Sequence, residues 1–365
     1  MDRELAVVLQ FLNSRGLNTT AQCLREEAGI NCTINEPNVL QRAIEFYDSF
    51  KNPGAKPLEF PGCNNKFLRD VQSTIEDVAG NSNPTCVACD PCSDRIVVGS
   101  AGAEVVILSP IEVILSATTP TAVLSVAWSS GGDIVATCMG GEVVILNSSD
   151  LSITCQFRQH GSTHVLNALF SPSSAHFLTF GRDSTIAIYR KPGSQWELHH
   201  VFRFATSVGS ACWVNEGVIA VGLYESYCLY YYSIDSLAEV GRSHLNQSVQ
   251  DFSLKAVPLA MDAWRGEFIA VSVAPNTVRI YQFMKDCPVR SFYTSNNDEY
   301  SNRQVAFSAD GSTLLVIDGC DIAIFETQSQ QQVHRIPVHA KSVRALARRK
   351  DRFVTVSFDR CLKIL

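Results

Sequence analysis

The chain has 365 residues, of which 46% are hydrophobic and 18% charged, so it holds enough apolar material for a buried core. Its formal net charge of -6 gives no overall basic field for binding the phosphates of a nucleic acid. No run reaches the roughly 18 apolar residues that a membrane-spanning helix needs, and the N-terminus lacks the pattern of a signal peptide. We therefore expect a folded intracellular protein of the cytoplasm or nucleus, with no membrane insertion, whose 13 cysteines are free thiols.

Residues 4–30 have the pattern of two short helices. Apolar residues recur at helical spacing in the first part, at Leu5, Val8 and Leu12. Gly16 suits the left-handed residue that closes a helix, and Asn18 or Thr19 can cap a second helix. About 30 residues are too few to bury a core of their own, so this apolar face must pack on a second copy or on another domain.

The same segment resembles the LisH motif, a helical homodimerisation element. The residues that carry this resemblance are Phe11, Leu12, Gly16, Thr20, Ala21, Leu24 and Glu27. The resemblance implies a homodimer that forms through residues 1–35, with Leu5 and Val8 on the same apolar face. A plain structural hairpin is the alternative for any pair of short amphipathic helices.

Residues 36–65 connect this hairpin to the rest of the chain. The segment 36–50 has the pattern of one amphipathic helix with Pro37 in its first turn. Prolines and glycines follow, at Pro53, Gly54, Pro57, Pro61 and Gly62, a composition that ends helices and separates domains. We expect three parts: a helical motif over 1–35, a helix and linker over 36–65, and a third domain over 66–365.

The third part contains seven copies of one pattern, in which short apolar runs alternate with polar or glycine-containing turns. The end of the first run of each copy falls at Cys89, Trp128, Phe170, Trp213, Trp264, Phe307 and Ala347, about 40 to 50 residues apart. Runs of five to seven residues rich in Val, Ile, Phe and Tyr are strands rather than helices. The sequence therefore predicts a mainly β fold, a seven-bladed β-propeller of four-stranded blades.

The last copy stops after its third strand, so its outer strand must come from elsewhere. The segment around Lys66–Val71, just ahead of the first copy, is the expected supplier. Such a pairing would close the ring and leave no blade unstacked.

The last copy also resembles a WD40 repeat, in which a His, an Asp and a Ser or Thr form a buried network. The matching residues are His339, Ser357 and Asp359, and the third copy matches through His160 (or His164) and Asp183. The Trp-Asp dipeptide that names the WD40 family is absent from every copy, so the resemblance is to divergent WD40 repeats. It implies a propeller that presents its loops to partner proteins.

Two groups of residues could have other functions. The spacing Cys86-x-x-Cys89-x-x-Cys92 could ligate a metal, but no fourth ligand follows, so we expect neither a metal nor a cofactor. The last copy is rich in basic residues that could bind an acidic or phosphorylated partner, at Arg344, Arg348, Arg349, Lys350 and Arg352. A solvated turn is the alternative.

The interpretation that these patterns favour is a non-catalytic scaffold protein. It would dimerise through its N-terminal helices and bind partner proteins on the propeller loops within a larger complex. We expect no catalytic residues. The alternatives are a propeller enzyme with a metal or acid/base site in the central channel, and nucleic-acid binding through the basic last blade.

Overall fold

The computed structural model describes residues 60–61, 70–109, 112–246, 258–274, 276–294, 303–349 and 352–365. The chain divides into two compact units, Met1–Glu59 and Phe60–Leu365, and all the described residues belong to the second unit. The predicted helical motif of residues 1–35 and the predicted helix of 36–50 therefore lie outside the described residues. No stretch of helix in the described parts has the length and apolar character to span a lipid bilayer.

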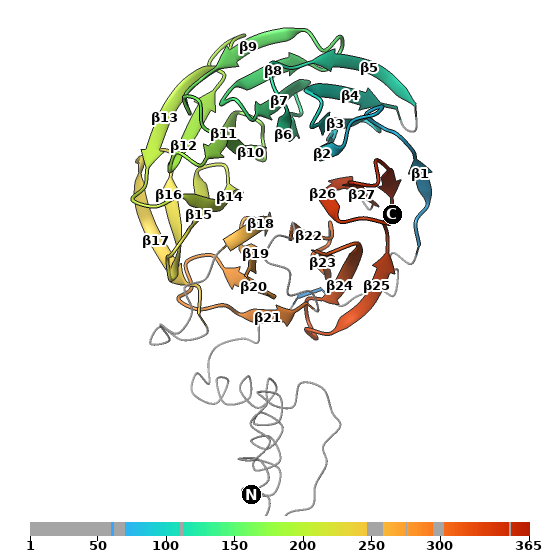
Figure 1. Ribbon diagram of the computed structural model, residues 1–365. Helices are drawn as coiled ribbons and strands as arrows, with labels where there is room; N and C mark the ends of the chain where they lie inside the picture. The colour runs from blue at the N-terminus through green and yellow to red at the C-terminus, as the bar shows by residue number, and fades with distance from the viewer. Residues whose placement is uncertain are drawn as a thin grey trace, which may run out of the picture. The chain divides into compact units, whose positions relative to one another are not determined.

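Within the described residues, 28 strands form seven antiparallel sheets of four strands each, arranged in a ring (Figure 1). This confirms the predicted seven-bladed β-propeller. We number the blades from the N-terminus. Five of the seven expected strand ends, Cys89, Trp128, Phe170, Trp264 and Phe307, are the last residues of the innermost strands.

The first four blades follow one another without interruption in strand order. Blade one comprises β2 (Pro84–Cys89), β3 (Ile96–Ser100), β4 (Glu104–Leu108) and β5 (Val113–Thr118). Blade two comprises β6 (Val123–Trp128), β7 (Asp133–Cys138), β8 (Val143–Asn147) and β9 (Ile153–Phe157). Blade three comprises β10 (Val165–Phe170), β11 (His176–Gly181), β12 (Thr185–Arg190) and β13 (Glu197–Arg203). Blade four comprises β14 (Val208–Asn215), β15 (Val218–Leu223), β16 (Cys228–Ser233) and β17 (Ala238–His244).

The remaining three blades include the one that closes the ring. Blade five comprises β18 (Pro258–Trp264), β19 (Phe268–Val273), β20 (Thr277–Gln282) and β21 (Arg290–Tyr293). Blade six comprises β22 (Val305–Phe307), β23 (Thr313–Asp318), β24 (Asp321–Glu326) and β25 (Gln332–Pro337). Blade seven comprises β26 (Val343–Arg349), β27 (Arg352–Ser357), β28 (Leu362–Ile364) and β1 (Ser73–Ile75).

Blade seven is completed by a strand from the other end of the propeller sequence. β1 pairs antiparallel with β28, with Ser73 opposite Ile364, and the backbone N–H of Gln72 donates to the carbonyl of Ile364 at 2.8 Å. The closing strand thus comes from the linker side of the first blade, as expected. It lies a few residues after the expected segment, because the residues that align with β28 are 73–75.

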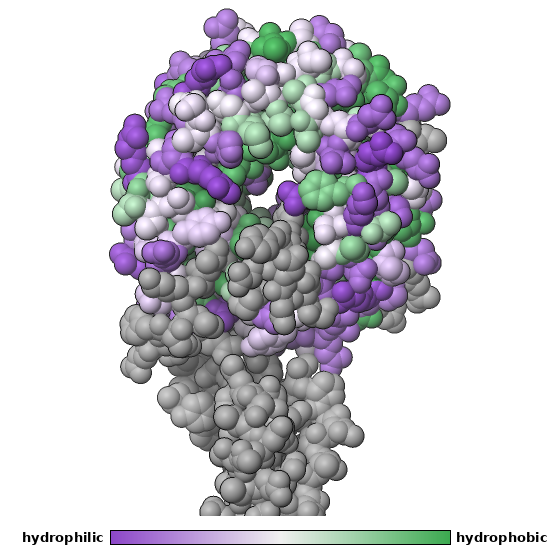
Figure 2. Space-filling model, in the orientation of Figure 1, coloured by the Kyte–Doolittle hydropathy of each residue, from purple (hydrophilic) through white to green (hydrophobic). Residues whose placement is uncertain are grey.

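The core lies between neighbouring sheets. The second and third strands of each blade are buried on both faces, as in β3, where all five residues are buried. One cluster joins Val135 and Ile145 of blade two to Phe177 and Tyr189 of blade three. Because each sheet is apolar on both faces, each blade is stable only when it is stacked between two others. Figure 2 shows the opening at the centre of the ring.

The turns lie at the two faces of the ring, which we call the AB face and the BC face. The AB face carries the turns between first and second strands, at residues 90–95, 129–132, 171–175, 216–217, 265–267 and 308–312. The BC face carries the turns between second and third strands, including residues 101–103, 139–142, 182–184, 224–227, 319–320 and 358–361.

Candidate functional site at the inner strands

The His and Asp predicted for the last blade lie in contact on the BC face. His339 Nδ1 is 2.9 Å from Asp359 Oδ2, and its Nε2 is 2.9 Å from the hydroxyl of Thr355. Ser357, the hydroxyl predicted for this network, accepts the backbone N–H of Asp359 at 3.3 Å and donates to the carbonyls of Lys341 and Ser342, at 2.8 and 3.0 Å. The hydroxyl that contacts the imidazole belongs to Thr355, which the sequence patterns do not indicate. Both hydroxyls fasten the loop before β26 to β27, but only Thr355 reaches the imidazole.

Blade three contains a second network of the same kind. His160 Nδ1 lies 3.0 Å from both oxygens of Asp183, and Nε2 lies 2.8 Å from the hydroxyl of Thr179. Thr185 adds a hydroxyl that donates to Asp183 at 2.7 Å. His164, the alternative histidine, contacts the carbonyl of Met139 instead. In both blades the network ties the second-to-third turn to the preceding loop.

The basic residues of blade seven do not form one exposed surface. Arg349 is buried and pairs with Asp94 of blade one. Arg344 lies at the BC end of β26, with its guanidinium 4.7 Å above the ring of Phe358. Arg352 is exposed at the opposite end, and Lys350 lies outside the described residues. The predicted patch is thus dispersed, because neighbouring positions of a strand face opposite sides of the sheet.

The three cysteines of the first blade point to different places. Cys86 packs in the cluster between blades one and two, whereas Cys89 packs against the cluster between blades seven and one. Burial raises the pKa of each of these two thiols to about 12, so both are protonated at neutral pH. Cys92 is exposed in the turn that follows. Among the described residues, no group of three or more His, Cys, Asp or Glu side chains is placed to hold a metal ion.

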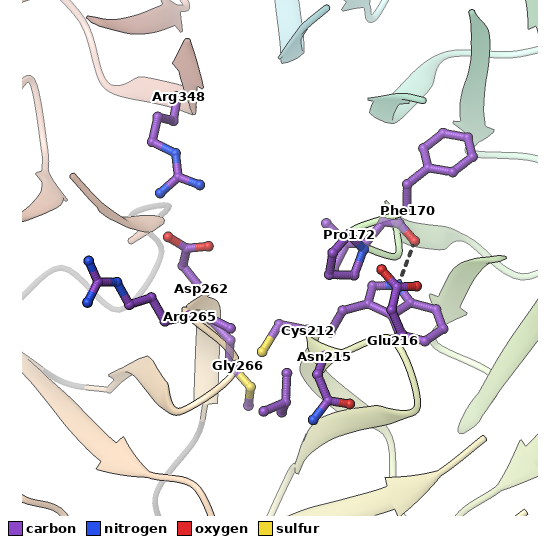
Figure 3. Close-up of a pocket in the computed structure, with 14 residues that line it drawn as sticks. Phe170, Pro172, Cys212, Asn215, Glu216, Asp262, Arg265, Gly266 and Arg348 are labelled. Carbon is purple, nitrogen blue, oxygen red and sulfur yellow. Dashed lines mark hydrogen bonds between the residues drawn. The ribbon is translucent and has the colours of Figure 1, made fainter. Parts of the chain in front are cut away.

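A cavity of about 580 Å³ opens at the inner strands on the AB face. It is lined by the ends of β10, β14 and β18 with their turns, and by Arg348 from β26 (Figure 3). Its apolar wall includes Leu169, Phe170, Pro172, Trp213 and Met261. The sequence patterns give no sign of this cavity.

An acid of blade five and a base of blade seven meet the backbone of blade six at one side of the cavity. The carboxylate of Asp262 on β18 accepts the backbone N–H of Phe307 at 2.8 Å, and Arg348 donates to the carbonyl of the same Phe307 at 3.1 Å. Figure 3 shows the Asp262 carboxylate and the Arg348 guanidinium facing each other. Burial raises the pKa of Asp262, and the charge of Arg348 opposes that rise. The backbone of blade six therefore bridges an acid of blade five and a base of blade seven.

The other polar groups of the cavity are largely engaged within the protein. Both carboxylate oxygens of Glu216 accept from Ser173, one from its backbone N–H and the other from its hydroxyl. The indole N–H of Trp213 donates to the carbonyl of Leu169 at 2.9 Å. Burial raises the pKa of Cys212, which keeps this thiol neutral. Arg265 is exposed, with its guanidinium 4.5 Å above the ring of Trp264.

Comparison with known proteins shows the fold and no family. No protein-family model matches the chain, and no curated protein matches it. Among the similar solved structures is the β-propeller domain of Cps50 (Swd1) from Myceliophteria thermophila, with a TM-score of 0.67 and 13% sequence identity. The match covers 81% of this chain and 98% of that domain. At that identity, the likeness shows a shared propeller fold alone.

One sequence signal could have indicated the cavity. Asp262 is an acidic residue inside an apolar strand, Pro258–Trp264, and a carboxylate in such a place requires a partner. Arg348 is a basic residue in the matching strand of blade seven. The sequence does not show that the two face each other, because blade six separates them along the chain.

Proposed function

We propose that this protein is a non-catalytic scaffold that binds partner proteins through its propeller and dimerises through residues 1–35. The observation that carries the first half is the cavity on the AB face, where a charged side of Asp262 and Arg348 adjoins an apolar wall. Pockets with a mostly apolar lining and a few placed polar groups are typical of binding sites.

The groups that line the cavity favour binding over chemistry. A cysteine nucleophile acts as its thiolate, whereas burial raises the pKa of Cys212. Asp262 is held by a backbone N–H, and no histidine lines the cavity among the described residues. The nucleic-acid alternative gains no support either, since Arg349 is buried and paired and Arg344 lies at the other end of the blade.

The cavity presents two exposed guanidinium groups, those of Arg265 and Arg348. Of its carboxylates, Asp262 is half-buried, and the exposed Glu216 already accepts two hydrogen bonds from Ser173. A guanidinium pairs well with a carboxylate in a partly desolvated site. The partner that fits is therefore a protein segment with an acidic side chain next to an apolar one.

Affinity purification of the intact chain against two charge-reversed variants tests this proposal. Arg348→Glu places a negative charge in the cavity, and Arg182→Glu makes the same change on the exposed BC face. We expect partner proteins to be lost from the first variant and retained by the second. An identical set of partners for both variants, or none above an empty-matrix control, would contradict the proposal.

The dimer is tested separately by light scattering of the full chain. The double variant Leu12→Asp, Leu24→Asp places charges on the apolar face that the LisH resemblance assigns to the dimer. We expect a monomer whose propeller remains folded, judged by its thermal unfolding. If the parent protein is itself a monomer, the dimer proposal is wrong while the partner-binding proposal stands.

A further inference from the structure

The groove between blades five and six on the AB face is filled by a residue that belongs to neither blade. Phe60 is only 5% exposed, and its ring centroid lies 4.7 Å from that of Phe268 and 6.4 Å from that of Trp264. The guanidinium of Arg290 lies 5.7 Å from the same ring. The backbone N–H of Phe60 donates to the side-chain carbonyl of Gln328, in blade six, at 2.7 Å.

Blade three has a comparable aromatic cluster on its opposite side, the side that faces blade two, and fills it with a residue of its own. Phe170 and Phe177 are paired across β10 and β11, as Trp264 and Phe268 are paired across β18 and β19. Trp196, in the turn between β12 and β13, covers the first pair, with ring centroids 5.7 and 4.8 Å away. In both clusters a third aromatic ring covers a cross-strand aromatic pair. Trp196 belongs to the blade that it covers, whereas Phe60 lies about 200 residues before Trp264 in the sequence.

The walls of this groove are held in place without Phe60. The indole N–H of Trp264 donates to the carbonyl of Ala309 in blade six, at 3.2 Å. The indole also lies against Gly311, where an added Cβ would come within 2.3 Å of the ring. Gly311 has φ +76°, a conformation that glycine adopts without strain. Trp264 is thus a fixed platform for another aromatic ring.

The contacts of Phe60 are those by which proteins recognise an extended peptide. An apolar slot takes a side chain, a cation lies beside its ring, and a side-chain carbonyl accepts a main-chain N–H. We propose that the groove between blades five and six is a binding site for an extended segment that carries an aromatic side chain, and that Phe60 occupies it in cis. A partner segment of that kind binds by displacing Phe60. The inference does not depend on the function proposed for the central cavity.

A labelled peptide of residues 55–65, with Cys63 replaced by Ser, tests the site by fluorescence anisotropy against the full-length protein. A tethered ligand acts at an effective concentration on the order of millimolar, so Phe60 should exclude the peptide from the parent protein. In Phe60→Ala the slot is vacant, and the peptide should bind at least about tenfold more tightly than to the parent protein. Phe60→Leu should give an intermediate affinity.

Three controls make the result specific to the slot. A peptide with Ala in place of Phe60 should not bind, and Gln328→Ala added to Phe60→Ala should weaken binding of the parent peptide. Trp196→Ala uncovers the Phe170–Phe177 pair on the side of blade three that faces blade two, where the peptide should not bind, because no side chain among the described contacts takes the role of Gln328 there. Equal binding to the parent protein and to Phe60→Ala, or binding to neither, would overturn the proposal. Thermal unfolding of each variant shows that the propeller is folded.

Discussion

The carboxylate of Asp359 is the centre of the network in the blade that closes the ring. It accepts from Nδ1 of His339 at 2.9 Å and from the backbone N–H groups of Ala340 and Cys361, each at 3.0 Å. Its side chain is 11% exposed. Asp359→Ala leaves all three donors without this acceptor, so we expect a large loss of stability. Asp359→Asn keeps one carbonyl oxygen and should lose less.

The size of the loss follows from these contacts. A hydrogen bond to a charged group contributes about 1.5–3 kcal/mol, so three would contribute roughly 4–9 kcal/mol if nothing replaced them. Ala340 is exposed, and water can replace part of the loss. We therefore expect Asp359→Ala to lower the free energy of unfolding by about 3–5 kcal/mol, and Asp359→Asn by about half of that.

The pH dependence of the stability gives a second, independent test of the network around Asp359. Burial lowers the pKa of His339, and the attraction of Asp359 partly offsets that effect. Without the carboxylate, the pKa of His339 in the folded protein falls further. The histidine of the unfolded chain takes up its proton near a pKa of about 6.5, so below that pH the unfolded state binds more protons and stability falls. The difference between the parent protein and Asp359→Ala should widen between about pH 7.5 and about pH 5.5.

Asp359 itself remains charged over this range. Burial alone would raise its pKa, but the hydrogen bonds from Cys361, His339 and Ala340 hold the pKa below its ordinary value. Urea unfolding followed by tryptophan fluorescence at the two pH values measures both effects, with Asp183→Ala as the matched variant in blade three. If Asp359→Ala lowered the free energy of unfolding by less than about 1 kcal/mol, this account of the network would be refuted. The same holds if its difference in stability from the parent protein became smaller on acidification.

Three further predictions concern closure, a turn and the thiols. Gln72→Pro removes the N–H that donates to Ile364 and should lower the melting temperature, whereas Gln72→Ala should not. Ser184→Gly relieves a φ of 60° and should raise the free energy of unfolding by about 0.5 kcal/mol, measured by urea unfolding. Iodoacetamide should alkylate the exposed Cys92 of the folded protein before Cys86, whose pKa burial raises to about 12, and peptide mass mapping should show the order.

The architecture could be predicted because its cause is local and repeated. Each blade has two strands that are apolar on both faces, and this pattern recurs with turns between the strands. Trp128, Phe170 and Trp264 end their innermost strands in the structure as expected. The fourth blade has three tyrosines in its third strand, Cys228–Ser233, and keeps the same strand order as the others, because that strand still alternates between two packed faces.

The partner of His339 could not be assigned from the sequence. Thr355 and Ser357 both carry a hydroxyl, and they lie two residues apart in β27, so they face the same side of the sheet. Strand periodicity therefore cannot distinguish between the two hydroxyls. The position of the imidazole along β27 decides which hydroxyl it contacts, and the loop before β26, which depends on the fold of the whole blade, sets that position.

The sequence does not indicate the cavity or the Phe60 groove, for a different reason. Asp262 and Arg348 come from blades five and seven, and Phe60 meets Trp264 and Gln328 across a very long stretch of sequence. Contacts of this kind depend on the ring bringing distant strands together. No spacing rule within one repeat can reveal them.

The pairing of β1 with β28 also determines how late in synthesis the ring can close. Ser73 leaves the ribosome about 290 residues before its partner Ile364, which at ordinary rates of synthesis is a delay of roughly 15–60 s. During that interval β1 has no sheet to join, and the earlier blades stand as an open arc with one uncovered face at each end. The newly made chain is therefore most open to misassembly just before blade seven emerges, a window in which a chaperone would act.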